Sequence, residues 1–239
     1  MTTIDEIKRF DLKITQPRQG YRFSLDPLLL VDFASGSPDV HRIADLGTGC
    51  GVMTLMLARV YPDARICAFE SNPEMAELAR HNALQNRLTQ QVEIHGEDIL
   101  QHKRLHPVSS FDLVVSNPPF RTPQSGRVSP HKGRDTARHE STAGLTDFLA
   151  AAKYLVKPGG RICFVYHPSR LAEFVSVSTG MKLALVRLQM VHGRSGLPAT
   201  MFLAELVKGR RGTLTVMPPL VIYQDDGSYT HQAMQLLTA

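Results

Sequence analysis

The chain has 239 residues, of which 43% are hydrophobic and 21% charged, so it can bury one sizeable core. The net charge of +5 and the isoelectric point of about 9.2 favour an anionic partner only weakly. The sequence has no recognisable secretory signal and no apolar run near the roughly 18 residues of a membrane span. Cys50, Cys67 and Cys163 are isolated, which argues against disulfides and against a zinc set. We therefore expect a cytoplasmic protein without bound metal.

The first 24 residues are polar and basic, and we expect an extended arm there. Tyr21 and Phe23 lie within it, and they either pack the arm onto the domain or form a flap over a cofactor. A short helix should begin at Asp26 and Pro27, a typical cap and first-turn pair that precedes an apolar run.

A strand, a glycine-rich turn and a helix follow in the order that a nucleotide-binding loop requires. The strand is predicted over Arg42–Leu46 and the buried helix over Val52–Val60. Between them Gly47–Gly51 reads GxGxG, and its glycines would let the backbone approach a ligand closely. The spacing differs from GxGxxG, and a glycine cluster alone could be only a tight turn.

Two acidic residues end the next predicted strands. Glu70 follows the strand Ala64–Phe69, about 20 residues after the glycine turn, where a carboxylate can bind both ribose hydroxyls. Asn72 and Pro73 then begin a helix. Asp98 follows the strand Val92–His95 and either accepts a hydrogen bond from an adenine amine or caps a helix.

The stretch Phe111–Phe120, FDLVVSNPPF, is an apolar strand that ends in a chemically distinctive turn. The Asn117 and Pro118 carbonyls could accept the two N–H bonds of an exocyclic amine, and Phe120 could cover its ring. The prolines remove backbone donors and fix φ, which would aim these carbonyls. An isolated Asn-Pro-Pro is more often only the end of a strand, but the glycine turn upstream favours the functional interpretation.

Residues 121–141 are basic and almost devoid of apolar side chains. Such a segment is either a solvated insertion or a loop that orders on a polyanion, and its position after Asn117 favours the second.

The remaining sequence predicts a helix near 145–156, a strand over 161–166, a helix over 168–179 and strands over 182–191 and 201–207. Two consecutive strands at the end of a βαβ series indicate an antiparallel edge on a parallel sheet. The tail from residue 209 should pack in an extended form.

The ordered motifs Asp45–Gly51, Glu70, Asp98 and Asn117–Phe120 resemble those of class I S-adenosylmethionine-dependent methyltransferases. The resemblance covers residues 42–208. It implies a Rossmann-like α/β fold: a mostly parallel, doubly wound sheet with an antiparallel last strand. The chain would then be one domain, with an arm (1–41), a core (42–208) that carries the basic loop (121–141), and a tail (209–239).

Three further segments resemble a bacterial family of tRNA adenine-N6 methyltransferases that act on adenine 37 of a valine tRNA. They are Gly20–Asp26, Ala137–Glu140 and the tail motifs Pro219–Tyr223 and Asp226–Tyr229. The tyrosine often found at the last motif position is Phe120 here, which keeps stacking but loses a phenolic hydrogen bond.

This resemblance implies a role for each motif residue. S-adenosylmethionine would be bound by Asp45, Gly47, Gly49, Gly51, Glu70, Asp98 and Asn117. The catalytic set would be Asn117, Pro118, Pro119 and Phe120. The tRNA would be held by Arg121, Arg127, Lys132, Arg134 and Arg138.

Three alternatives remain open. A protein-glutamine methyltransferase would use the same planar pocket, but it usually carries a helical domain before the glycine turn. A guanine-N2 methyltransferase of ribosomal RNA has a similar motif. A non-catalytic RNA-binding protein is disfavoured by the intact Asp45 and Asn117 motifs.

Overall fold

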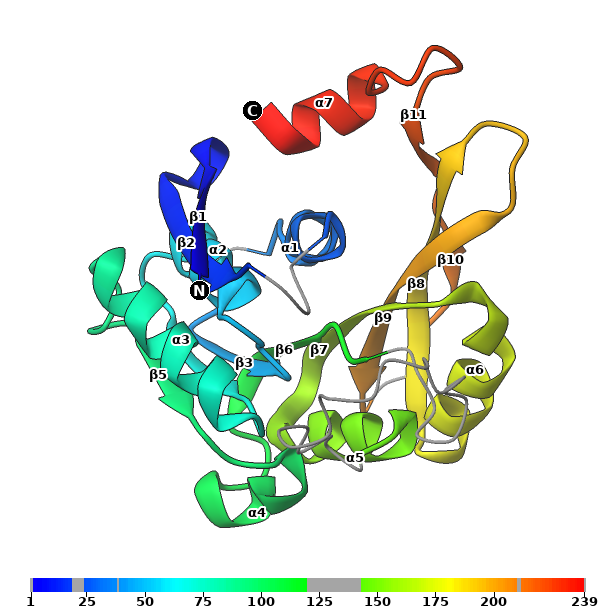
Figure 1. Ribbon diagram of the computed structural model, residues 1–239. Helices are drawn as coiled ribbons and strands as arrows, with labels where there is room; N and C mark the ends of the chain where they lie inside the picture. Colours follow the sequence, from blue (N-terminus) through cyan, green and yellow to red (C-terminus); the bar gives the residue numbers. More distant parts are fainter. Residues whose placement is uncertain (1, 19–23, 38, 120–142, 210–211, 239) are drawn as a thin grey trace, which may run out of the picture.

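The computed structural model describes residues 2–18, 24–37, 39–119, 143–209 and 212–238. These residues build a nine-stranded sheet with a parallel centre, covered by helices (Figure 1). The parallel strands are β3 (Arg42–Leu46), β4 (Arg65–Phe69), β5 (Val92–His95), β6 (Phe111–Ser116) and β7 (Val156–Tyr166). The predicted mostly parallel α/β fold is confirmed.

The order β5-β4-β3-β6-β7 places a topological switch point between β3 and β6. The chain runs outward from β3 to β5 and then returns to the other side of β3. Leu46 at the end of β3 is in register with Phe69 of β4 and with Ser116 of β6. The residues that follow these three strands therefore meet at one edge of the sheet, where ligands bind in open α/β folds.

The antiparallel strand was predicted correctly, but its place at the sheet edge was wrong. β9 (Ala199–Lys208) lies between β7 and β8 (Leu183–Arg194) and is antiparallel to both. The physical reason is burial: residues 202–207 are buried on both faces of the sheet, whereas most of β8 is only half-buried. β10 (Thr215–Val216) and β11 (Leu220–Tyr223) pair in parallel with β8.

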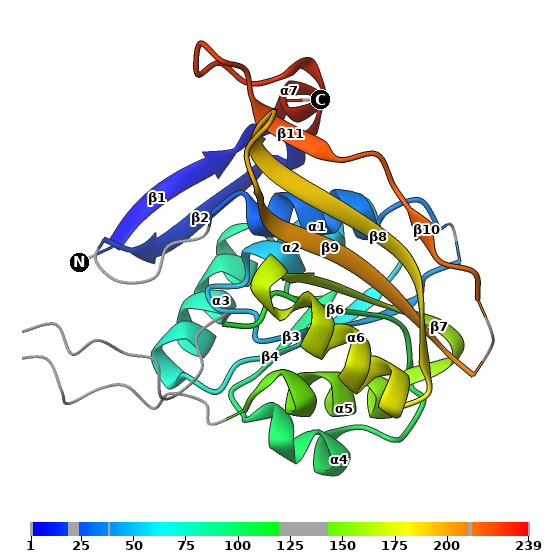
Figure 2. The ribbon, with the colours of Figure 1, turned by 90° about the vertical axis from the view of Figure 1, so that its right-hand side faces the viewer.

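Helices cover both faces of the sheet, as Figure 2 shows. α1 (Asp26–Ala34), α2 (Val52–Val60) and α3 (Pro73–Gln85) lie on one face. α5 (Leu145–Leu155) and α6 (Leu171–Gly180) lie on the other, with the short α4 (His102–Leu105) beside α5. Strand residues alternate between the two cores, so Ile43 faces the first and Ala44 the second. No helix in the described ranges is long and apolar enough to cross a membrane.

The N-terminal segment is a β-hairpin and not the extended arm that its composition predicted. β1 (Thr2–Ile7) and β2 (Leu12–Pro17) pair in antiparallel fashion around a 3-10 turn over Lys8–Phe10. The other edge of β2 is paired by two asparagine side chains, one in α3 (Pro73–Gln85) and one directly after it. Asn82 bonds to the N–H and C=O of Thr15, and Asn86 bonds to those of Lys13, at 2.8–2.9 Å.

The C-terminal segment is only partly extended. After β10 and β11 it ends in α7 (His231–Thr238), which the sequence analysis did not predict. The two ends of the chain meet where Arg9 Nη1 donates a hydrogen bond to the Leu236 carbonyl, at 2.6 Å.

Candidate functional site

The glycine turn between β3 and α2 has the backbone of a ligand-binding loop. Gly47, Gly49 and Gly51 have φ values of +78°, +59° and +88°, which residues with a side chain rarely adopt. A Cβ atom at Gly49 would meet no atom within 4 Å, so this position borders open space. A Cβ atom at Gly51 would lie 3.1 Å from the Ala79 Cβ, so Gly51 allows α3 to approach the turn.

Glu70 lies directly against this turn. Its Oε2 accepts a hydrogen bond from the Gly49 N–H at 2.8 Å, and its Oε1 accepts one from the Asn72 N–H at 2.9 Å. Burial raises the pKa of the Glu70 carboxyl, although these N–H groups oppose the rise. The structure thus brings together the turn and the acid that the sequence separates by about 20 residues. Each carboxylate oxygen keeps capacity to accept a second hydrogen bond, for example from a ribose hydroxyl.

Asp45 lies beneath the turn and is fully buried. Its Oδ2 accepts a hydrogen bond from the Thr54 hydroxyl at 2.6 Å, and Thr54 Oγ1 lies 2.8 Å from Thr48 Oγ1. The second carboxylate oxygen, Asp45 Oδ1, is buried and has no hydrogen-bond partner among the described residues. Thr48 and Thr54 were missed at the sequence level because threonine in a turn or helix carries no distinctive pattern.

Burial raises the pKa of Asp45 to about 6, although hydrogen bonds from Thr54 and Thr48 oppose the rise. An unfolded aspartate ionises near pH 3.9, so the folded protein loses stability as pH rises through about 4 to 6. We expect Asp45→Asn, which keeps an acceptor for Thr54 without ionising, to be more stable than wild type at pH 7.5. The expected gain is on the order of 2–3 kcal/mol and should vanish near pH 4. Urea unfolding at both pH values measures it, and an equal effect at the two would contradict this account.

Asn117 follows β6 at the switch point. The hydroxyl of the preceding Ser116 is buried and donates a hydrogen bond to the Leu46 carbonyl, at 2.8 Å. This bond ties the end of β6 to the start of the glycine turn. Asn117 is half-buried, and no described residue forms a hydrogen bond with its side-chain amide. Pro118 is buried and Pro119 exposed. The amide is therefore available to a ligand beside the turn.

Asp98 caps the 3-10 turn Ile99–Gln101, because its Oδ1 accepts a hydrogen bond from the Leu100 N–H at 3.0 Å. The capping interpretation is thus confirmed, and the adenine-binding role stays a prediction. Phe120 and the predicted RNA contacts lie outside the described residues, as do Tyr21 and Phe23. The predicted RNA contacts are Arg121, Arg127, Lys132, Arg134 and Arg138.

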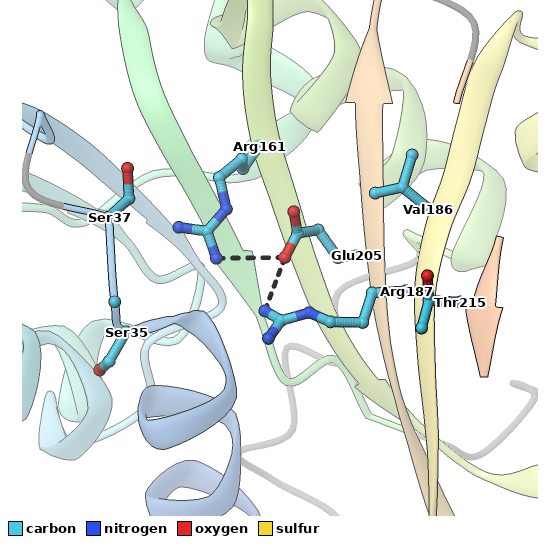
Figure 3. Close-up of a pocket in the computed structure, with 8 residues that line it drawn as sticks. Ser35, Ser37, Arg161, Val186, Arg187, Glu205 and Thr215 are labelled. Carbon is cyan, nitrogen blue, oxygen red and sulfur yellow. Dashed lines mark hydrogen bonds and ion pairs between the residues drawn. The ribbon is translucent and has the colours of Figure 1, made fainter. Parts of the chain in front are cut away.

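A cavity of about 450 Å³ is lined by Arg161 of β7, Arg187 of β8 and Glu205 of β9, and Asn117 is not among its lining residues (Figure 3). Glu205 Oε2 lies 2.6 Å from Arg187 Nη2 and 3.1 Å from Arg161 Nη2. Although burial acts to raise it, the two arginines hold the pKa of Glu205 below its usual value. These ion pairs join β7, β8 and β9, so we interpret this polar cluster as structural.

Two solved structures illustrate the fold that the chain shares. A predicted O-methyltransferase from Agrobacterium tumefaciens matches with a TM-score of 0.70 and 23% identity, covering 88% of this chain and 94% of that one. TrmN from Thermus thermophilus matches with a TM-score of 0.55 and 22% identity, covering 77% and 48% of the two chains. The doubly wound sheet with a switch point that these structures share with the chain is the Rossmann-like fold.

Sequence comparison shows the family to which the chain belongs. Residues 27–194 match the model of the methyltransferase small domain. A tRNA1(Val) (adenine(37)-N6)-methyltransferase from Porphyromonas gingivalis is 35% identical over 197 residues, 80% of this chain and 75% of that protein. One from Yersinia pseudotuberculosis is 31% identical over 205 residues, 84% and 79% of the two chains. The chain belongs to the methyltransferase small domain family.

Proposed function

We propose that this methyltransferase transfers a methyl group from S-adenosylmethionine to N6 of an adenine in tRNA, at position 37 beside the anticodon of a valine tRNA. The observation that carries the proposal is the position of Asn117 at the switch point, directly after Ser116, whose hydroxyl bonds to the Leu46 carbonyl before the glycine turn. Relatives named for this reaction, 31% and 35% identical over four fifths of the chain, support the choice of substrate. A tRNA substrate implies that the protein acts in the cytoplasm.

The residues around the turn fit the cofactor. Gly49 borders open space in which the methionine part would lie, and Glu70, which contacts the Gly49 N–H, would bind its ribose. Asp45 Oδ1, which has no hydrogen-bond partner among the described residues, is a buried acceptor that a bound amino group or an ordered water would satisfy. Asp98 and Asn117 complete the proposed cofactor set. When bound, S-adenosylmethionine supplies the methyl group.

The acceptor chemistry rests on the turn after β6. An adenine N6 is a poor nucleophile because its lone pair is delocalised into the ring. The Asn117 and Pro118 carbonyls would accept its two N–H bonds, hold the amine in place and favour a tetrahedral nitrogen with a localised lone pair. Phe120, together with Pro119, would cover the extruded base, and a base in an anticodon loop is cheaper to extrude than a paired one. This catalysis needs no strong base.

The basic residues between 121 and 138 are proposed to hold tRNA phosphates. We expect the double variant Arg127→Gln/Lys132→Gln to bind tRNA more weakly and to lower the slope of log affinity against log salt by about 2. The matched control is Arg65→Gln/Lys182→Gln, which removes two exposed cations from the amino ends of strands β4 and β8. An unchanged slope in the Arg127→Gln/Lys132→Gln variant would mean that these two residues do not contact tRNA phosphates.

The function itself is tested by tritium transfer from labelled S-adenosylmethionine into bulk tRNA that lacks this modification, followed by nucleoside analysis. Label in N6-methyladenosine, located at adenine 37 of the valine tRNA, is the expected result. Label in N2-methylguanosine or in protein glutamine would mean that the protein is a methyltransferase with a different substrate from the one proposed. No transfer to any of these acceptors would contradict the proposal.

A further inference from the structure

A second cluster of reactive side chains lies at the β4–β5 edge of the sheet. Cys67 is in β4, His95 ends β5, and His106 lies between α4 and β6. The Cys67 sulfur and one nitrogen of each histidine all lie within 4.8 Å of one another. The three residues are 28 and 11 positions apart, so no sequence motif announces them. Cys67 is buried and both histidines are half-buried, which limits access of water to the cluster.

The geometry of the two histidines suits a shared metal ion. His95 Nε2 and His106 Nε2 are 3.4 Å apart. Two nitrogens that bind one tetrahedral zinc ion, each at about 2.0–2.1 Å, lie about 3.3–3.4 Å from each other. A direct hydrogen bond of that length would be poor, because N–H donors usually lie about 2.7–3.2 Å from their acceptors.

A fourth donor stands next to these three. Glu93 Oε1 is 3.5 Å from His95 Nε2, and the Glu93 side chain is 68% exposed and thus able to adjust. Glu93 and Cys67 are register partners on adjacent strands, so their side chains project from the same face. A thiolate, two imidazoles and a carboxylate form a ligand set that suits zinc and not magnesium or calcium.

The surroundings hold the rings in place. Phe69 stacks on His95 at 5.2 Å between ring centroids and meets His106 edge-on at 5.6 Å. Arg42 is the nearby positive group: it faces both Cys67 and His106 and lies over the Phe111 ring at 5.1 Å. The carboxylate and the thiolate together would balance a divalent ion beside this guanidinium.

We propose that Cys67, His95, His106 and Glu93 bind one zinc ion. The ion joins the end of β5 to the segment before β6. It therefore also braces the cofactor side of the sheet, because the His95 carbonyl accepts a hydrogen bond from the Glu70 N–H at 3.0 Å. The proposal departs from the expectation, made from the sequence, that the three cysteines have no part in a zinc set. It does not depend on the proposed RNA substrate, since the metal can be measured without any substrate.

The test uses the full chain without a histidine tag, stripped with a chelator, dialysed against Zn²⁺ and analysed for metal by mass spectrometry. One zinc ion per chain is expected. Competition with a chromogenic chelator should show binding at least about tenfold weaker in Cys67→Ser and in His106→Ala. The matched controls are Cys163→Ser, a buried thiol of β7, and His81→Ala, an exposed histidine of α3, and neither should change the affinity.

Two further measurements keep the test decisive if a core variant folds poorly. Glu93→Gln changes an exposed side chain, so it should fold normally and still bind zinc several-fold more weakly. Co²⁺ in place of zinc should give a thiolate charge-transfer band in wild type and in Cys163→Ser, but not in Cys67→Ser. Absence of stoichiometric zinc, or equal affinity in wild type, Cys67→Ser and His106→Ala, would overturn the proposal.

Discussion

Asn117→Ala is expected to slow methyl transfer about 10³-fold, the size of effect seen when one preorganised polar group is removed from an active site. Alanine removes the carbonyl that would accept an N6–H bond, whereas the Gly49–Glu70 and Thr54–Asp45 hydrogen bonds are kept. Asn117 is only one of the seven proposed cofactor contacts, so the cofactor affinity should fall far less than the rate. Single-turnover methylation measures the rate, and calorimetry with S-adenosylmethionine measures the affinity.

The matched control is Asn117→Asp. Aspartate has the same length and keeps acceptor oxygens while losing the amide N–H₂, so it should retain much more activity than alanine. Loss of cofactor affinity in parallel with activity would mean that Asn117 serves the cofactor and not the acceptor amine. Equal activity of the aspartate and alanine variants would show that the acceptor oxygen is not what matters.

Asn82→Ala is expected to lower the free energy of unfolding by about 3–4 kcal/mol. The Asn82 side chain is fully buried and bonds to the Thr15 N–H, the Thr15 carbonyl and the Cys50 carbonyl, at 2.8–2.9 Å. Alanine would leave these three backbone groups buried without partners. Because Cys50 lies in the glycine turn, the cofactor affinity should fall as well. Urea unfolding and calorimetry measure the two effects.

Gln85→Ala is the control for this prediction, since Gln85 is on the same helix and bonds to the same strand. Its contact with the Lys13 carbonyl, at 3.3 Å, is exposed, and its contact with Thr15 Oγ1, at 3.1 Å, is only partly buried. Water replaces lost partners at such a site, so the change should stay below about 0.5 kcal/mol. Similar losses for Asn82→Ala and Gln85→Ala would show that the buried bonds do not anchor the hairpin.

The parts of the site that sequence could predict are those in which local pattern and parallel-strand register suffice. β3, the glycine turn and α2 were predicted with their bounds because the apolar runs and glycines are contiguous. Glu70 and Asn117 could be assigned to the same edge because each follows a buried strand. Asn72 was predicted as the cap of α3, and its side chain accepts from the Glu74 and Met75 N–H groups.

What the sequence could not predict depends on partners that are distant along the chain. Asn82 looks like one more polar residue of an amphipathic helix, and only the fold places it against β2, 67 residues away. The Cys67, His95 and His106 cluster is assembled from separate elements in the same way. β9 lies inside the sheet because it is buried on both faces. An apolar run in the sequence does not reveal this, because an edge strand that is covered by another element has the same pattern.

The position of β9 also sets an order of events during synthesis. The ribosome releases β7 and then β8, yet the hydrogen-bonding edge of β7 belongs to β9, which emerges last of the three. Until residue 208 has left the exit tunnel, β7 carries an open edge next to an apolar core, the kind of surface through which nascent chains pair wrongly. Because β8 joins the rest of the sheet only through β9, we expect the two strands to dock as a hairpin. The edge of β7 is thus sealed only after β9 has emerged, and β10 and β11 add to β8 later still.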